Sequence, residues 1–99
     1  MIFANISMSD LVRKHIVVSG RVQGVGFRYR ASHAAMLLNL TGWVRNDDCG
    51  TVTMELQGDE SSIYRIIPML EKSSWIRIED WQEQNIPVEE TERGFHVRG

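Results

Sequence analysis

Cysteine is almost absent from this sequence, because Cys49 is the only one in 99 residues. A single cysteine excludes an internal disulfide and favours a reducing compartment, so we expect a cytoplasmic protein. No apolar run approaches the roughly 20 residues of a membrane span, and the start, MIFANISMSD, lacks the features of a signal peptide. The length suits one domain, and we expect it at residues 11–99 after a loose N-terminal arm at residues 1–10.

A large excess of positive charge is also missing. The formal net charge is -2 at pH 7, which argues against a module that binds nucleic acid through its phosphates. Residues 1–50 carry six Lys or Arg and three Asp or Glu, whereas residues 51–99 carry five and ten. This asymmetry fits either an acidic, solvated surface or a small anion site in the first half of the chain.

Metal ligands are not grouped in the sequence. The three histidines have no metal-ligand spacing with one another or with Cys49, so we expect no metal site. The three tryptophans are interpreted as packing residues, because the RNA-binding signature of small sheet domains does not occur in any strand. These residues are His15, His33, His96, Trp43, Trp75 and Trp81.

The sequence does contain several segments in which apolar and polar residues alternate, and this pattern predicts β-strands. The clearest case is GTVTMELQG, in which Val52, Met54 and Leu56 are separated by polar residues. Gly50 suits a tight hairpin turn before it, and the polar segment Asn85–Gly94 is predicted to be a loop. The five predicted strands are Arg13–Ser19, Thr41–Asn46, Gly50–Gly58, Ser74–Trp81 and Phe95–Arg98.

Two further segments have helical periodicity. The first begins near Phe27, and Asn39 is suited to the left-handed exit of that helix. The second follows the capping residue Asp59, and Pro68 inside it predicts a kink or an early end. The apolar stripes are Phe27, Ala31, Ala34 and Leu38 in the first helix and Ile63, Ile66, Ile67 and Leu70 in the second.

The resulting order is β-α-β-β-α-β, followed by the short closing strand. This order predicts an α+β fold, the ferredoxin-like sandwich, with two helices on one face of an antiparallel sheet. Right-handed crossovers place the first and third strands side by side in the middle of that sheet.

The stretch GRVQGVGFR, Gly20–Arg28, joins the first strand to the first helix. Glycines allow consecutive backbone N–H groups to face one point, and a helix N-terminus carries unpaired N–H groups and partial positive charge. Arg28 lies in the first helical turn and can add a bidentate contact to a phosphate. The stretch is therefore either a phosphate cradle or a flexible turn with a surface arginine.

Several phosphate-binding motifs are excluded. The nucleotide P-loop needs a lysine that this stretch lacks, and the dinucleotide motif GxGxxG fails because Gly24 and Gly26 are followed by Tyr29. A cysteine phosphatase with arginine six positions after Cys49 would need it where Glu55 stands. No activated covalent nucleophile is apparent.

GRVQGVGFR, followed by a helix, then GWVRN, then GTV and QG, and FHVR at the end, resembles the acylphosphatase family. The resemblance covers roughly Arg13 to Arg98 and implies the ferredoxin-like fold. It implies hydrolysis of the carboxyl-phosphate bond of small acyl phosphates, with no cofactor and with inorganic phosphate as an inhibitor. Two departures are Asn39, where the family commonly has glycine, and Cys49, where it usually has a polar residue.

The resemblance also implies the roles of individual residues. Arg28 is the key side chain of the phosphate site, and Asn46, at the end of GWVRN, orients the attacking water. The loop residues that would bind the phosphoryl group are Gln23, Gly24, Val25, Gly26, Phe27 and Arg28.

Two other functions remain open at this stage. One is a binding or regulatory module that holds a phosphate or nucleotide on the same fold without turnover, and the presence of both Arg28 and Asn46 favours the enzyme over it. The other is a piece of a larger carbamoyl-transfer protein, which the lack of a trailing linker or metal-binding segment disfavours. We expect a monomer with a small-molecule substrate and with neither nucleic acid nor a membrane as partner.

Overall fold

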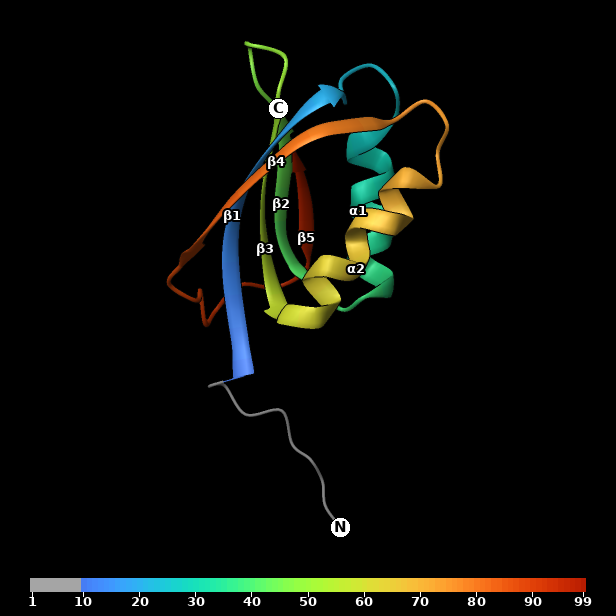
Figure 1. Cartoon of the computed structure of the whole chain (residues 1–99). Coiled ribbons are helices and arrows are strands. Elements are labelled where there is room, and N and C mark those ends of the chain that lie inside the picture. The colour runs from blue at the N-terminus through green and yellow to red at the C-terminus, as the bar shows by residue number, and fades with distance from the viewer. Residues whose placement is uncertain (1–9) are drawn as a thin grey trace.

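The computed structural model describes residues 10–99, in which two helices lie on one face of a five-stranded sheet (Figure 1). The first strand begins at Leu11, and the arm expected at residues 1–10 falls almost wholly outside the described residues. The elements are β1 (Leu11–Arg21), α1 (Phe27–Leu37), β2 (Thr41–Asn46), β3 (Val52–Asp59), α2 (Glu60–Glu71), β4 (Arg77–Ile86) and β5 (Phe95–Arg98).

The sheet has the order β4-β1-β3-β2-β5, so β1 and β3 lie side by side near its centre as predicted. These two strands are antiparallel, with Leu11 opposite Asp59 and Val18 opposite Val52. The closing strand β5 instead runs parallel to β2. The ferredoxin-like α+β fold is confirmed, but the sheet is mixed and not antiparallel throughout.

The interior lies between the sheet and the two helices, and the alternating residues of the strands form one side of it. Ile16 and Val18 of β1 and Val52, Met54 and Leu56 of β3 are fully buried. The predicted stripes of the helices form the other side, although Leu38 and Ile67 are only partly buried. The members that are fully buried are Phe27, Ala31 and Ala34 of α1 and Ile63, Ile66 and Leu70 of α2.

The helix ends also follow the sequence. Asn39 has a left-handed φ of 58° directly after α1, as expected of the exit residue. Asp59 occupies the N-cap of α2, but the helix does not end early at Pro68 and continues to Glu71. The helix continues because Leu70, one turn beyond Ile66, is also buried in the core.

The fourth strand differs most from the prediction. It was expected at residues 74–81 but spans Arg77–Ile86, because its polar second half pairs with β1 from Arg13 to Val17. Asn85 therefore belongs to a strand and not to the predicted loop.

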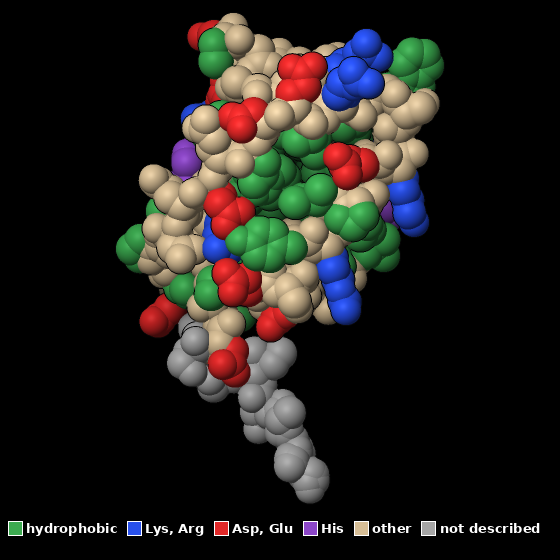
Figure 2. Space-filling view, in the orientation of Figure 1, with side chains coloured by type: hydrophobic (Ala, Val, Ile, Leu, Met, Phe, Trp, Pro, Cys, Tyr) green, Lys and Arg blue, Asp and Glu red, His purple; other side chains and the backbone are tan. Residues whose placement is uncertain are grey.

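Figure 2 shows hydrophobic side chains in a hollow of the face shown, with acidic and basic side chains beside it.

Two cations of β1 are buried, which the sequence does not indicate. Arg13, which is 3% exposed, donates to Glu55 at 3.0 Å and to Glu92 at 2.7 Å on the face of the sheet opposite the helices. Lys14 lies on the other face and donates to Asn85 at 2.8 Å, with Glu83 at 3.2 Å. The charges are satisfied within the protein, which is the condition for burying them.

Candidate active site

The glycine-rich loop, the β2–β3 hairpin and the end of β5 all lie at one end of the sheet (Figure 1). In the loop, Gly24 and Gly26 have φ of 74° and 82°, in the left-handed region that side chains disfavour. A Cβ on either glycine would meet nothing within 4 Å, so the glycines are needed for their backbone conformation and not for lack of room.

Gly26 is the N-cap of α1 and provides no side chain to cap the helix. The unpaired N–H groups of the first helical turn, and the positive end of the helix dipole, therefore face the cavity that Gly24, Gly26 and Arg28 line. Phe27 begins the helix and is 1% exposed, so it anchors this turn in the core. The loop thus presents backbone donors from a fixed position.

Gln23 does not line this cavity. Its Nε2 donates to the backbone oxygens of Asp47 at 2.7 Å and Thr51 at 2.8 Å, which belong to the β2–β3 turn. Gln23 therefore fastens the loop to the hairpin that follows Asn46. Val25 is half-buried and packs against the core.

Arg28 extends from the first turn of α1 toward the end of β5. Its Nη1 donates to the main-chain oxygens of Arg98 at 3.4 Å and Gly99 at 3.3 Å. These bonds are long, and they hold the guanidinium beside the glycine-rich loop. Only Nη1 of Arg28 donates a side-chain hydrogen bond within residues 10–99, so most of the five N–H donors can face a ligand.

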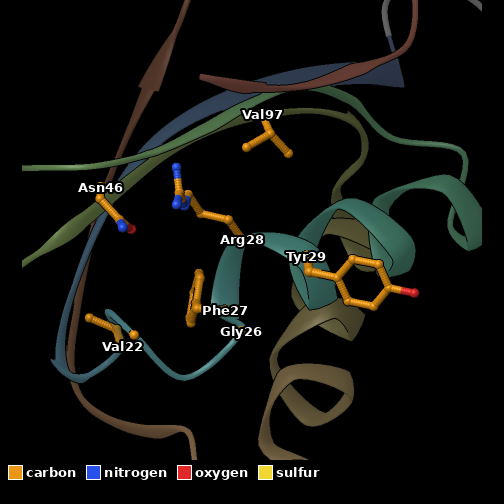
Figure 3. Close-up of a pocket in the computed structure, with 8 residues that line it drawn as sticks. Val22, Gly26, Phe27, Arg28, Tyr29, Asn46 and Val97 are labelled. Carbon is orange, nitrogen blue, oxygen red and sulfur yellow. The ribbon is translucent and has the colours of Figure 1, made fainter. Parts of the chain in front are cut away.

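Asn46 is the last residue of β2, as the sequence suggested. Its Oδ1 is buried and has no hydrogen-bond partner in the described structure. A buried oxygen of this kind costs free energy unless water or a ligand satisfies it. Figure 3 shows the Asn46 side chain on the opposite side of the Arg28 guanidinium from Val97.

Five of the seven predicted site residues line a single open cavity of about 390 Å³, and Gln23 and Val25 do not. Three further residues line it that the sequence did not single out: Val22, Tyr29 and Val97. Of these three, Val97 could have been predicted, because the alternation of FHVR places it on the inner side of β5. The five expected residues are Gly24, Gly26, Phe27, Arg28 and Asn46.

The turn after Asn46 is held by a charged side chain. Asp47 accepts hydrogen bonds from Thr53 at 2.6 Å and Thr51 at 2.7 Å, and from Arg45 at 3.1 Å. Burial opposes ionisation of Asp47, but these hydrogen bonds outweigh it and lower the pKa of its carboxyl group. The ionised form therefore fixes the backbone beside Asn46 at neutral pH.

The family model for acylphosphatase matches residues 14–97. The chain belongs to the acylphosphatase family. An acylphosphatase from Clostridium perfringens is 43% identical over 86 residues, which are 86% of this chain and 97% of that protein. An acylphosphatase from Geobacillus kaustophilus is 54% identical over 59 residues, a match that spans 60% of this chain and 63% of that protein.

The fold agrees with a solved structure of the same family. An acylphosphatase from Coxiella burnetii superimposes with a TM-score of 0.81 at 33% identity, covering 91% of this chain and 95% of that one. Among residues 10–99, no group of three or more His, Cys, Asp or Glu side chains is placed to hold a metal ion. Neither helix of this region is long and apolar enough to cross a membrane.

Proposed function

We propose that this member of the acylphosphatase family hydrolyses the carboxyl-phosphate bond of small acyl phosphates, with the phosphoryl group in the loop Gln23–Arg28. The observation that supports this most is the unpartnered, buried Oδ1 of Asn46 in the same cavity as Arg28 and the helix N-terminus. A site that only binds an anion needs hydrogen-bond donors such as Arg28 and the helix N-terminus. The Oδ1 of Asn46 is an acceptor beside these donors, so it can hold a water molecule next to the bound phosphoryl group.

In this mechanism the backbone N–H groups of Gly24, Gly26 and Phe27 and the guanidinium of Arg28 hold the phosphoryl oxygens. The transition state spreads negative charge over those oxygens, and donors placed in advance stabilise it without reorganising. Gln23 supports the loop through its contacts with the hairpin and is a positioning residue in this scheme.

Asn46 orients the water. Its Oδ1 accepts a hydrogen bond from the water, which then attacks phosphorus opposite the bond that breaks. The water's proton passes to a phosphoryl oxygen of the substrate, and the carboxylate leaves with the electron pair of the broken bond. Because a carboxylate leaves without needing a proton, the scheme requires no general acid.

The test is hydrolysis of benzoyl phosphate without added metal by the wild type, Arg28→Ala and Asn46→Ala. Removal of one well-placed charge-stabilising donor lowers kcat by about 10²–10³, and we expect at least this loss for Arg28→Ala. Asn46→Ala should lower kcat while leaving competitive inhibition by inorganic phosphate intact. Equal rates for the wild type and Arg28→Ala would refute the mechanism.

The same measurements separate this function from a phosphate-binding module without turnover. That alternative predicts phosphate binding that depends on Arg28 together with no hydrolysis by the wild type. No observation in the structure favours it over the enzyme.

We further propose that the protein acts as a cytoplasmic monomer. Cys49, the one cysteine, is exposed and unpaired, which suits a reducing compartment. The edge strand β4 carries Arg77, Glu79, Asp80 and Glu83, and such charges discourage pairing between sheet edges. Sedimentation analysis at several protein concentrations tests the monomer.

A further inference from the structure

Two cavities lie along the seam between α1 and β5, which pack against each other. The first, next to the phosphate loop, contains Arg28 and Val97, and the second, of about 420 Å³, contains Ser32, Met36 and Phe95. We call the two cavities together the α1–β5 groove.

The spacing of these residues shows why the two cavities are aligned. Arg28, Ser32 and Met36 follow one another at intervals of four, so they form one row along α1. Val97 and Phe95 are two positions apart and therefore lie on the same side of β5. Because β5 runs toward the site and α1 runs away from it, the two rows border a single path of about 12 Å from Arg28 to Met36.

The groove has an unequal distribution of charge. Arg28 is the only charged residue among those that line its two cavities in the described structure, and it lies at the end next to the phosphate loop. Beyond it the walls are largely apolar, yet Val97 is 50% exposed and Met36 is 68% exposed. Ser32, in the middle, is small enough to leave the path open.

We propose that the acyl chain of the substrate lies in the α1–β5 groove, so that this enzyme favours acyl phosphates with long, unbranched, apolar acyl chains. The inference rests on the proposed function, since it takes the phosphoryl group to be in the loop beside Arg28. With the phosphate there, the attached acyl chain is next to Val97, and the path past Ser32 to Met36 and Phe95 covers apolar surface that would otherwise stay in water.

The groove is open on one side, which sets the size of the effect. Complete burial of a methylene group corresponds to about fourfold in an equilibrium constant. If the open groove keeps half of that free energy, each added methylene raises the equilibrium constant about twofold. Octanoyl phosphate has about six more methylene groups than acetyl phosphate, so its kcat/KM should be higher by roughly several tens of fold.

The experiment measures kcat/KM for acetyl, butanoyl, hexanoyl and octanoyl phosphate. The variant Ser32→Leu places a larger side chain in the middle of the groove, and it should reduce the ratio of octanoyl to acetyl phosphate to near one. Ser61→Leu is the matched control, because it makes the same exchange at an exposed position of α2 that lines neither cavity. It should retain the wild-type ratio.

Binding of methylphosphonate and octylphosphonate, which are not hydrolysed, keeps the two proposals distinguishable. We expect octylphosphonate to bind the wild type more tightly by a similar factor, and Ser32→Leu to remove the difference. If no acyl phosphate is hydrolysed but the octyl compound still binds more tightly, the proposed function fails and the groove stands. A flat kcat/KM series together with equal phosphonate affinities overturns the groove proposal.

Discussion

Replacing Gln23 with methionine tests whether the loop and the hairpin form one unit. Methionine has a similar length but no polar atoms, so Gln23→Met removes the two donated hydrogen bonds to Asp47 and Thr51 while it keeps most of the volume. Each such bond contributes about 0.5–1.5 kcal/mol net, and the two carbonyls lose a partner. We expect the free energy of unfolding to fall by about 2 kcal/mol.

The assay is urea unfolding followed by tryptophan fluorescence. A small domain has an m-value of about 1–3 kcal/mol/M, so the midpoint should fall by about 0.7–2 M. Gln82→Met is the matched control, because Gln82 is exposed on the edge strand β4 and its side chain donates only to Asp80 in the described structure. A surface change of this kind should stay within about 0.5 kcal/mol.

The same variant should lower activity more than stability explains. Under conditions in which Gln23→Met is fully folded, kcat for benzoyl phosphate should fall about tenfold, because Asn46 and the loop no longer share a fixed geometry. The reasoning is refuted if Gln23→Met is as stable and as active as Gln82→Met.

Three further predictions concern the scaffold. Gly42→Ala should lose several kcal/mol of stability, or fail to fold, in thermal unfolding, because the new Cβ would lie 1.8 Å from the backbone oxygen of Glu55 at a φ of 138°; Gly50→Ala, which meets no atom within 4 Å, is the milder comparison. Burial opposes ionisation of Glu55, but its hydrogen bonds with His15 and Arg13 lower the pKa of this carboxyl group below the usual 4.5. The stability that ionised Glu55 contributes is therefore complete above pH 4.5 and is lost as the pH falls through the lower pKa of the folded state. Urea midpoints between pH 6 and about 3 should decline less steeply in Glu55→Gln than in the wild type. Cys49→Ser should keep kcat within about twofold, because the thiol is exposed at the hairpin tip and, among residues 10–99, its side chain hydrogen-bonds only to Thr51, at 3.3 Å. A loss of tenfold or more would show a role in the site.

The strands and helices of this fold were predictable wherever burial imposes a period on the sequence. Val52, Met54 and Leu56 alternate because one face of β3 is in the core, and that pattern is visible without a structure. The second half of β4 was missed because both of its faces carry polar residues, so nothing in QEQNI distinguishes an edge strand from a loop. Its pairing with β1 is a tertiary property.

The candidate site divides in the same way. Gly24, Gly26 and Arg28 could be predicted as one group because their chemistry is concentrated in one short stretch. The contacts of Gln23 with the hairpin, and of Arg28 with Arg98 and Gly99, join residues far apart in the sequence and leave no local signal. The antiparallel direction predicted for β5 was wrong for a similar reason, since a four-residue strand pairs equally well by pattern in either direction.

Under the proposed mechanism, the contacts of Arg28 would also determine when the enzyme becomes active during folding. They connect positions 70 and 71 residues apart, and Gln23 adds connections over 24 and 28 residues. Contacts across such separations close large loops and form late in folding. Recovery of hydrolysis after dilution from urea should therefore lag behind recovery of helical circular dichroism. Under the proposed mechanism, turnover would report the final docking of β5 and not early collapse.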